Sequence, residues 1–193
     1  MKAQKQTVEA VNEDWQLKAV AQGMQERGRI YGDIWRIGIN TGLRISDLLS
    51  LTMDQVRDID FELKHPELAI IEQKTGKVNE IRLNEAAQTV IQRRLKDHAG
   101  DTYLFQTESK RNREPMALNR RSVGRVLESV GKPLKLKLGT HSMRKTAGHY
   151  LHSKCVPIED IAHFLNHRDP KVTMRYLGLT KQARAELFDM LPG

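Results

Sequence analysis

The sequence has few of the residues that mark several large protein classes. Its single cysteine, Cys155, excludes a disulfide within the 193 residues and is typical of a reducing compartment. We interpret Cys155 as a small buried apolar residue. No apolar run approaches the ~18 residues that a membrane-spanning helix needs, and the N-terminus lacks the apolar stretch of a signal peptide. We therefore expect a cytoplasmic protein with no membrane partner.

Aromatic residues are also scarce, at 5%, which disfavours a surface for stacking single-stranded bases. Basic residues are in excess instead: 32 Lys and Arg oppose 24 Asp and Glu, giving a net charge of +8. Such an excess favours a polyanionic partner, either nucleic acid or a membrane surface. Between positions 108 and 139, nine basic side chains face three acidic ones. The nine are Lys110, Arg111, Arg113, Arg120, Arg121, Arg125, Lys132, Lys135 and Lys137.

Each of these basic residues taken singly is typical of a solvated surface. Together they equally well predict a strip that follows a duplex phosphate backbone, because each cation placed on a phosphate releases counterions. We therefore expect double-stranded DNA as a partner and this strip as the DNA-binding region.

The apolar pattern predicts one mainly α (α+β) domain. Helical spacing is found near the N-terminus, around 30–41, 46–51, 87–95 and 123–130, and from Thr140 to the end. Between these segments the period changes to alternation, which predicts three short antiparallel strands around 59–63, 68–71 and 78–83. There is no internal repeat and no low-complexity tract.

Two helix starts near the C-terminus carry residues suited to phosphate chemistry. Thr140 is a suitable N-cap that places His141 in the first helical turn and Arg144 one turn later. Free backbone N–H groups at a helix N-terminus favour an anion there. On its own, however, this pattern is better explained as a capped helix. Further along, Asp169-Pro170 opens a short helix that carries Tyr176.

Other candidate motifs are weaker. His163 and His167 have the spacing of zinc ligands on a helix, but no third ligand is evident, so we expect no metal. Gly76-Lys77 does not form a nucleotide-binding loop, because Ile71 replaces its first glycine. Arg44 lies at a corner between helices, where it either pairs with a carboxylate such as Asp47 or is held toward an anion.

Taken in order, these residues resemble the active site of the tyrosine recombinase (phage integrase) family. The stretch TGLRISDLLSLTMDQV resembles the first-arginine box, HSMRKTAGHYL the histidine–arginine box, and IAHFLNHRDPKVTMRYL the second-histidine and tyrosine box. The resemblance covers about 40–177, most of the chain. It assigns catalytic roles to Arg44, Lys74, His141, Arg144, His167 and Tyr176.

The resemblance implies cleavage and rejoining of DNA through a covalent 3′-phosphotyrosine on Tyr176. Arg44 and Arg144 would hold the non-bridging oxygens, Lys74 would protonate the leaving 5′-oxygen, and the two histidines would serve as acid/base and hydrogen-bond donor. No cofactor, ATP or metal is needed. It also implies a homo-oligomer that forms a tetrameric synapse on DNA, with accessory DNA-bending proteins as further partners. The protein would be encoded by a bacterium or a phage and associated with the nucleoid.

The sequence departs from the family pattern in three places. Asn166-His167 stands where Gly-His is usual, and Lys77 competes with Lys74 for the hairpin-lysine role. Residues 1–40 are also too few for the N-terminal domain that most members close around DNA. We expect an N-terminal helical segment at 1–28, a catalytic domain at 29–177 and a tail helix at 178–193 that docks on a neighbouring protomer or folds back on its own domain.

Two other functions share these residues. A type IB topoisomerase would use the same nicking chemistry to relax DNA without site dependence. A DNA-binding regulator would keep the fold but no longer cut. The short length and the wording of the boxes favour the recombinase over the topoisomerase, and the presence of all six expected side chains disfavours the regulator. A metal-dependent nuclease is least favoured, because the acidic ligands it needs are not grouped.

Overall fold

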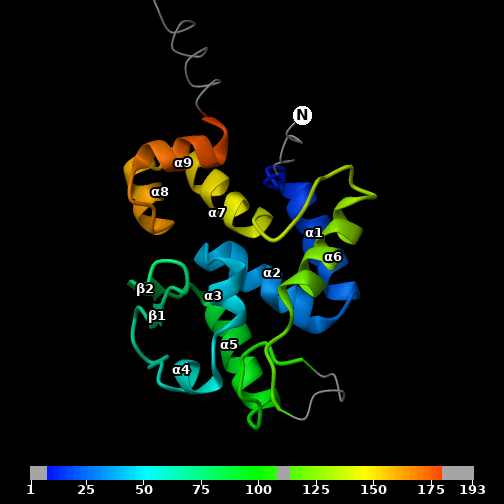
Figure 1. The fold of residues 1–193 in the computed structure, drawn as a ribbon, viewed down its shortest axis with the longest axis vertical. Coiled ribbons are helices and arrows are strands. Elements are labelled where there is room, and N and C mark those ends of the chain that lie inside the picture. The colour runs from blue at the N-terminus through cyan, green and yellow to red at the C-terminus, as the bar shows by residue number, and fades with distance from the viewer. Residues whose placement is uncertain (1–7, 108–113, 180–193) are drawn as a thin grey trace, which may run out of the picture.

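Helices dominate the structure, a computed structural model that describes residues 8–107 and 114–179 (Figure 1). The elements are α1 (Asp14–Glu26), α2 (Arg29–Thr41), α3 (Ile45–Leu49), α4 (Met53–Arg57), β1 (Glu67–Ile71), β2 (Val78–Arg82), α5 (Glu85–Asp97), α6 (Arg120–Gly131), α7 (Ser142–Ser153), α8 (Ile158–Phe164) and α9 (Pro170–Leu177). The predicted α+β class is confirmed, with the helices near their expected positions. The short helix α4 had not been predicted.

The small sheet is a hairpin of β1 and β2, paired antiparallel from Glu67–Arg82 to Ile71–Val78. Its alternating residues Leu68, Ile70 and Ile81 are buried, as period-2 patterning requires.

The third strand, expected around 59–63, does not form, so the sheet within the described residues has two strands. There the carboxylate of Asp60 accepts the backbone N–H of Glu62 at 3.0 Å. A local turn of this kind competes with strand pairing. In addition, Leu63 is 57% exposed, so the apparent alternation did not mark a buried face.

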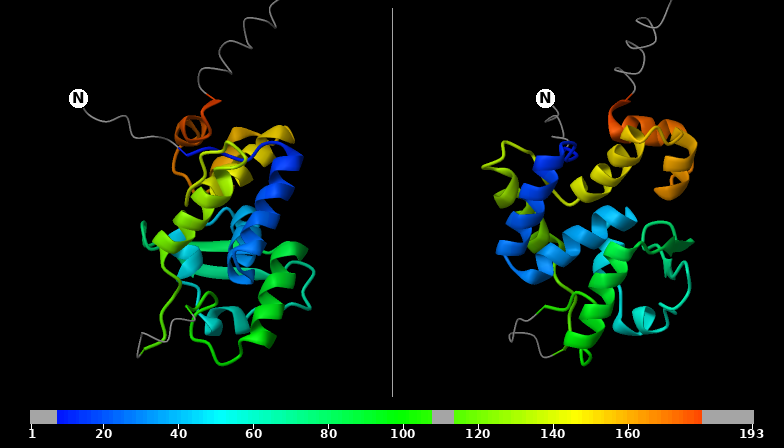
Figure 2. Two further views of the ribbon diagram at one scale, coloured as in Figure 1. Left: turned by 90° about the vertical axis from the view of Figure 1, so that its right-hand side faces the viewer. Right: turned by 180° about the vertical axis from the view of Figure 1, so that it is seen from behind.

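Helix α2 lies at the centre of the molecule and contacts α1, α5 and α7 (Figures 1 and 2). Its apolar side buries Ile34, Trp35 and Ile37 in the main core. The helix ends at Gly42, which adopts the left-handed conformation (φ 62°) and donates its N–H to the carbonyl of Gly38 at 3.1 Å. This sharp end turns the chain directly into α3 and positions the corner that carries Arg44.

Helices α7, α8 and α9 form a second, smaller core from Ile161, Leu165 and Leu177. Helix α7 begins at Ser142, one residue later than predicted, because the Ser142 hydroxyl accepts the N–H of Gly139 at 3.0 Å and His141 occupies the N-cap position. Helix α8 likewise begins one residue after Pro157. The start of α9 at Asp169-Pro170 is confirmed, since the Asp169 side chain accepts the N–H of Lys171 at 2.8 Å.

Ahead of α1, residues 8–12 form no helix or strand and make hydrogen bonds to segments far along the chain. The N–H of Glu9 donates to the carbonyl of Lys137 at 2.9 Å, and the N–H of Val11 donates to the hydroxyl of Thr146 on α7 at 2.9 Å. The helical segment expected from residue 1 therefore begins only at Asp14 within the described residues.

Cys155 is exposed, so its interpretation as a buried apolar residue is wrong. It lies in the turn between α7 and α8 with a positive φ of 58°, and its N–H bonds the carbonyl of His152 at 2.9 Å. The turn places the side chain in solvent rather than in the core. None of the helices in residues 8–107 and 114–179 has the length and apolar character to cross a membrane.

Candidate active site

Arg44 begins the site at the corner between α2 and α3, where it occupies the N-cap position of α3. Its guanidinium Nη1 lies 2.7 Å from the carboxylate of Glu72 and 3.9 Å from that of Asp47. We had predicted that Arg44 either pairs with a carboxylate such as Asp47 or is held toward an anion. In the structure the shorter ion-pair distance is to Glu72. The Arg44 side chain is 16% exposed, so the pair holds the cation at the edge of the core with little freedom to move.

Glu72, which follows β1, was missed by the sequence analysis. Its buried carboxylate accepts the Thr75 hydroxyl at 2.7 Å and the Asn79 amide at 3.4 Å, in addition to bonds from Arg44 and Asn166. Burial alone would raise the pKa of Glu72, but these hydrogen bonds outweigh it and lower the pKa. A sequence signal did exist: an acidic residue closes an otherwise apolar strand directly before the hairpin turn.

Arg144 extends from α7 into the space between the two cores and is 4% exposed. Its Nη1 donates to the carbonyl of Gly42 at 2.6 Å, and its Nη2 donates to the carbonyl of Leu165. Burial, helped by the nearby Arg44 charge, lowers its pKa to about 10, so the group stays protonated at neutral pH. Arg144 thus ties the α2–α3 corner to the end of α8.

The turn after α8 carries Asn166 and His167. Asn166 has a φ of 46°, a left-handed conformation that Asn tolerates better than most residues, which accounts for Asn in a place where glycine was expected. His167 Nδ1 lies 2.8 Å from the hydroxyl of Thr173 on α9. Burial and the charges of Arg144 and Arg44 lower the pKa of His167 to about 4, so its ring is neutral at pH 7.

Tyr176, on α9, packs edge-to-face against His167 with 5.4 Å between ring centroids. Its hydroxyl donates to the backbone carbonyl of His141 at 3.3 Å. Burial raises the pKa of Tyr176 to about 12 against the opposing charges of Arg144 and Arg44. The phenol is therefore neutral at pH 7 and would need a proton acceptor to become a nucleophile.

Lys74, His141 and Arg120 surround an open pocket of about 400 Å³ beside Arg44. Lys77, the rival for the hairpin-lysine role, is not among the residues that line it. Partial loss of solvent, together with the charges of Arg120 and Arg144, lowers the pKa of His141, so this imidazole too is neutral at pH 7.

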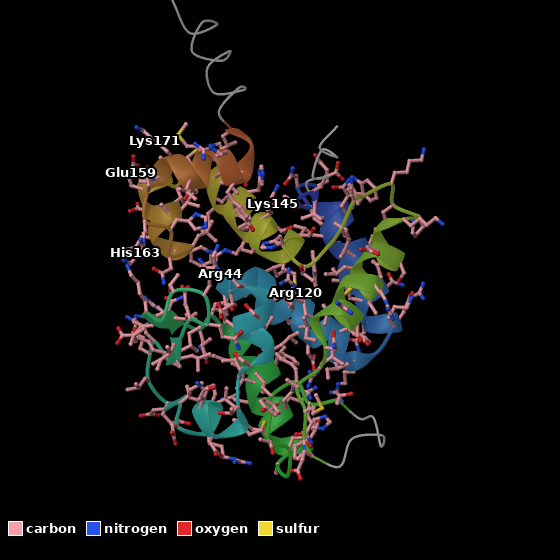
Figure 3. All side chains as sticks on the ribbon, viewed as in Figure 1. Arg44, Arg120, Lys145, Glu159, His163 and Lys171 are labelled. Carbon is pink, nitrogen blue, oxygen red and sulfur yellow. The ribbon has the colours of Figure 1, made fainter. Side chains whose placement is uncertain are left out.

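Lys145, beside Arg144 on α7, is a second neighbour of the site that sequence reasoning missed. Its Nζ lies 5.5 Å from the centroid of the Tyr176 ring and donates to the carbonyl of Val8 at 3.0 Å. Figure 3 shows it on α7, apart from Arg44 at the α2–α3 corner. Burial lowers the pKa of Lys145, and the Glu9 charge opposes that change.

The predicted basic strip is placed only in part. Its exposed members on α6 are Arg120, Arg121 and Arg125, and those after α6 are Lys132, Lys135 and Lys137. Lys110, Arg111 and Arg113 lie outside the described residues. Of the zinc-spaced pair, His163 is exposed at the outer edge of α8 (Figure 3) while His167 binds Thr173. Across the described ranges, no three His, Cys, Asp or Glu side chains are grouped to hold a metal.

The six residues that the sequence singled out therefore converge from four parts of the chain: the α2–α3 corner, the hairpin, α7 with its N-cap, and the α8–α9 region. Such a set can bind an anion between Arg44 and Arg144 beside a tyrosine hydroxyl. It can also supply proton donors and acceptors on both sides of that anion.

The comparisons agree with this arrangement. The chain matches the model of the phage integrase family over residues 12–183. It is 32% identical over 157 residues to the probable integrase/recombinase YoeC of Bacillus subtilis, covering 81% of each chain. It is 29% identical over 160 residues to the tyrosine recombinase XerA of Pyrococcus furiosus, covering 79% of this chain and 54% of XerA.

Solved structures share the fold. A complex of the XerH site-specific recombinase with its palindromic difH substrate has a TM-score of 0.73 at 16% identity, covering 98% of this chain and 55% of that one. The Tn1549 transposon integrase in complex with circular intermediate DNA has a TM-score of 0.69 at 22% identity, covering 97% and 67%. The chain belongs to the phage integrase family, and the prediction of a site-specific tyrosine recombinase is confirmed.

Proposed function

We propose that this recombinase cleaves and rejoins duplex DNA through a covalent bond between Tyr176 and a 3′-phosphate. The observation that carries the proposal is the position of the Tyr176 hydroxyl, bonded to the His141 backbone at the N-cap of the helix from which Arg144 projects. Around this hydroxyl come together the His167 ring, in edge-to-face contact with Tyr176, and the charges of Arg44 and Arg144, which act on both rings.

In the proposed reaction the Tyr176 oxygen forms a bond to the scissile phosphorus, and the bond from phosphorus to the 5′-oxygen breaks. Arg44 and Arg144 neutralise the charge that grows on the non-bridging oxygens in the transition state. The neutral His141 imidazole accepts the phenol proton, which the raised pKa of Tyr176 makes necessary.

Lys74 donates a proton to the departing 5′-oxygen, which leaves as a hydroxyl. Its place on the pocket wall, where Lys77 is absent, supports this assignment. His167, held by Thr173, donates a hydrogen bond to the phosphate. The reverse sequence, with a 5′-hydroxyl from another strand as nucleophile, rejoins the DNA and restores the phenol. Because the phosphotyrosine keeps the bond energy, the cycle consumes no nucleotide.

The expected partner is double-stranded DNA, bound along the exposed basic residues of α6 and the segment that follows it. The charge supports this, as does the fact that the XerH and Tn1549 structures are complexes with DNA. We further propose a tetrameric synapse, accessory DNA-bending proteins and a place in the nucleoid. We also propose the division of the chain into an N-terminal segment at 1–28, a catalytic domain at 29–177 and a tail at 178–193. The tail, most of which lies outside the described residues, would dock on a neighbouring protomer or on its own domain.

Covalent trapping tests the proposal. The protein is incubated with DNA from the flanks of its own gene, quenched in detergent and examined for protein-linked DNA, using the wild type, Tyr176→Phe and the control Tyr150→Phe. Tyr150 is half exposed on α7 and lies away from the pocket.

We expect an adduct with the wild type and Tyr150→Phe and none with Tyr176→Phe. An adduct that survives Tyr176→Phe would show that the nucleophile is a different residue. Tight binding with no adduct in any variant would favour a DNA-binding regulator. Relaxation of arbitrary supercoiled DNA without site dependence would favour a topoisomerase.

A further inference from the structure

We infer that Arg120 binds the DNA phosphate next to the scissile one, on the His141 side of the active-site pocket. This separates Arg120 from the rest of the basic strip and makes it a substrate-positioning residue for the strand that is cut. The inference rests on the proposed function, since it presupposes a scissile phosphate between Arg44 and Arg144.

The first observation is position. Arg120 is the first residue of α6, yet it lines the same pocket as Arg44, Lys74 and His141, which come from other elements. Figure 3 shows Arg120 on the α6 side of Arg44. The side chain is directed by a 3.4 Å bond from its Nη2 to the hydroxyl of Thr140, the residue before His141. Its charge lies close enough to contribute to the lowered pKa of His141.

The second observation is charge. None of the residues that line this pocket is acidic, whereas three of them carry a fixed positive charge. Within the part of the chain that the structure describes, Arg44 is paired with Glu72, but no carboxylate lies within ion-pair distance of Arg120. A guanidinium has five N–H donors, so Arg120 keeps most of them available for an anion in the pocket.

The third observation concerns the helix itself. Cations near a helix N-terminus are unfavourable because that end carries a partial positive charge, and acidic residues are preferred. Helix α6 instead begins with Arg120 and Arg121 and has no acid in its first turn. The start of the helix is fixed by Asn119, whose side chain accepts the N–H of Arg121 at 2.7 Å. Arg120 thus opposes the local field, and an anion in the pocket relieves that cost.

The scissile phosphate has two arginines already, so Arg120 is available for a second phosphate. Because Arg120 projects from α6 and Lys74 from the hairpin, the two cations approach the pocket from different elements. Arg120 lines the pocket together with His141 and bonds Thr140, the residue before it. We therefore place the continuation of the strand, beyond a scissile phosphate held by Arg44 and Arg144 with its 5′-oxygen toward Lys74, past His141 toward Arg120. We therefore assign the neighbouring phosphate on that side to Arg120.

The test uses the DNA site mapped by covalent trapping. A set of duplexes carries one neutral methylphosphonate each, at successive positions of the cleaved strand, and the rate of adduct formation is measured. The proteins are the wild type, Arg120→Ala, Arg120→Lys and Arg121→Ala, which removes the same charge one residue further along α6 but outside the pocket. Circular dichroism and thermal melting report whether each variant is folded.

We expect neutralisation of one flanking phosphate to slow the wild type by about tenfold or more, the effect of losing a charge-assisted hydrogen bond. Arg120→Ala should lose a similar factor on unmodified DNA and show no further loss at that one position. Arg120→Lys should recover part of the rate. Arg121→Ala should keep the wild-type sensitivity at that position while binding DNA more weakly at low salt and with a smaller salt dependence.

Losses from Arg120→Ala that add to those of the methylphosphonate at every position would overturn the inference, because they would show that Arg120 contributes only general charge. Equal behaviour of Arg120→Ala and Arg121→Ala would also overturn it. The absence of any adduct with the wild type is a different result: it would overturn the proposed function, and this inference with it.

Discussion

The candidate active site has two sides that differ in burial: the side chains of one are fixed by hydrogen bonds within the protein, whereas those of the other are exposed to the substrate. The first, which we call the anchored wall, consists of Arg44, which lines the pocket, together with Glu72 and Arg144, which do not line it. All three are largely buried and hydrogen-bonded to protein groups. The second, the open wall, consists of Lys74, Arg120 and His141, which are exposed. The sequence gives both walls polar residues of similar kinds, so the difference lies in their surroundings.

The contrast indicates that the two walls have different roles in the proposed reaction. Groups fixed before the substrate arrives need no reorganisation when charge develops in the transition state, and this is where electrostatic catalysis gains most. Groups that transfer protons serve first the departing 5′-oxygen and then the 5′-hydroxyl that arrives from another strand, so looser positioning suits them. Changes to the anchored wall should therefore cost folding stability as well as rate, and changes to the open wall should cost rate alone.

The largest combined effect is expected for Arg144→Ala. The carbonyls of Gly42 and Leu165 would lose their donor inside the protein, and the link between the two cores would be broken. We expect the free energy of unfolding to fall by about 2–4 kcal/mol and adduct formation to be abolished. Urea denaturation measures the first and covalent trapping the second. An inactive Arg144→Ala with unchanged stability would remove the basis for the anchored wall.

On the open wall, Lys74→Ala should slow cleavage by about 10²–10⁴-fold, the usual contribution of a general acid, with unfolding unchanged. A substrate with sulfur in place of the bridging 5′-oxygen needs no proton on its leaving group, so it should restore the rate. Lys77→Ala is the matched control, because Lys77 lies in the same connection between β1 and β2 but does not line the pocket. Rescue of Lys77→Ala instead of Lys74→Ala would reverse the assignment.

A smaller effect, visible in its pH dependence, is expected for Glu72→Gln. Because the pKa of Glu72 is lowered in the folded protein, its carboxylate stabilises the fold fully above the ordinary glutamate pKa. That contribution is lost as the pH falls through the lowered value. Wild type should exceed Glu72→Gln by about 1–3 kcal/mol near neutral pH. The gap should close in acid. A gap that is independent of pH would show that the charge on Glu72 does not act through Arg44.

The smallest effect is expected for Asn166→Gly. Glycine accepts the positive φ at this turn without strain, so the substitution removes only the side-chain bond to Glu72. We expect a loss of about 1 kcal/mol or less in stability. Asn166→Ala, which also strains the turn, should lose more. Thermal melts of the two variants compare these costs, and a more stable Asn166→Ala would show that the backbone conformation is not what selects Asn here.

The sequence alone predicted much of the fold and most of the candidate site. The spacing of Val90 and Ile91 in α5, and the Asp169-Pro170 start of α9, were readable because period and capping are local properties. The strand around 59–63 failed because a three-residue alternation could not show that Asp60 would bond its own backbone neighbour. Cys155 failed because its burial depends on how a turn leaves α7, which composition does not encode.

The sequence itself determined the family and the candidate catalytic residues with their order, since Arg44, His141, Arg144, His167 and Tyr176 stand in short sequence motifs. Only the tertiary structure decided which groups support them. It placed Glu72 against Arg44, turned Asn166 toward Glu72, brought Lys74 rather than Lys77 to the pocket, and set Arg120 apart from the basic strip. The physical reason is that ion pairing, burial and charge shifts act over a few ångströms between segments far apart in the chain, and sequence spacing carries no record of those distances.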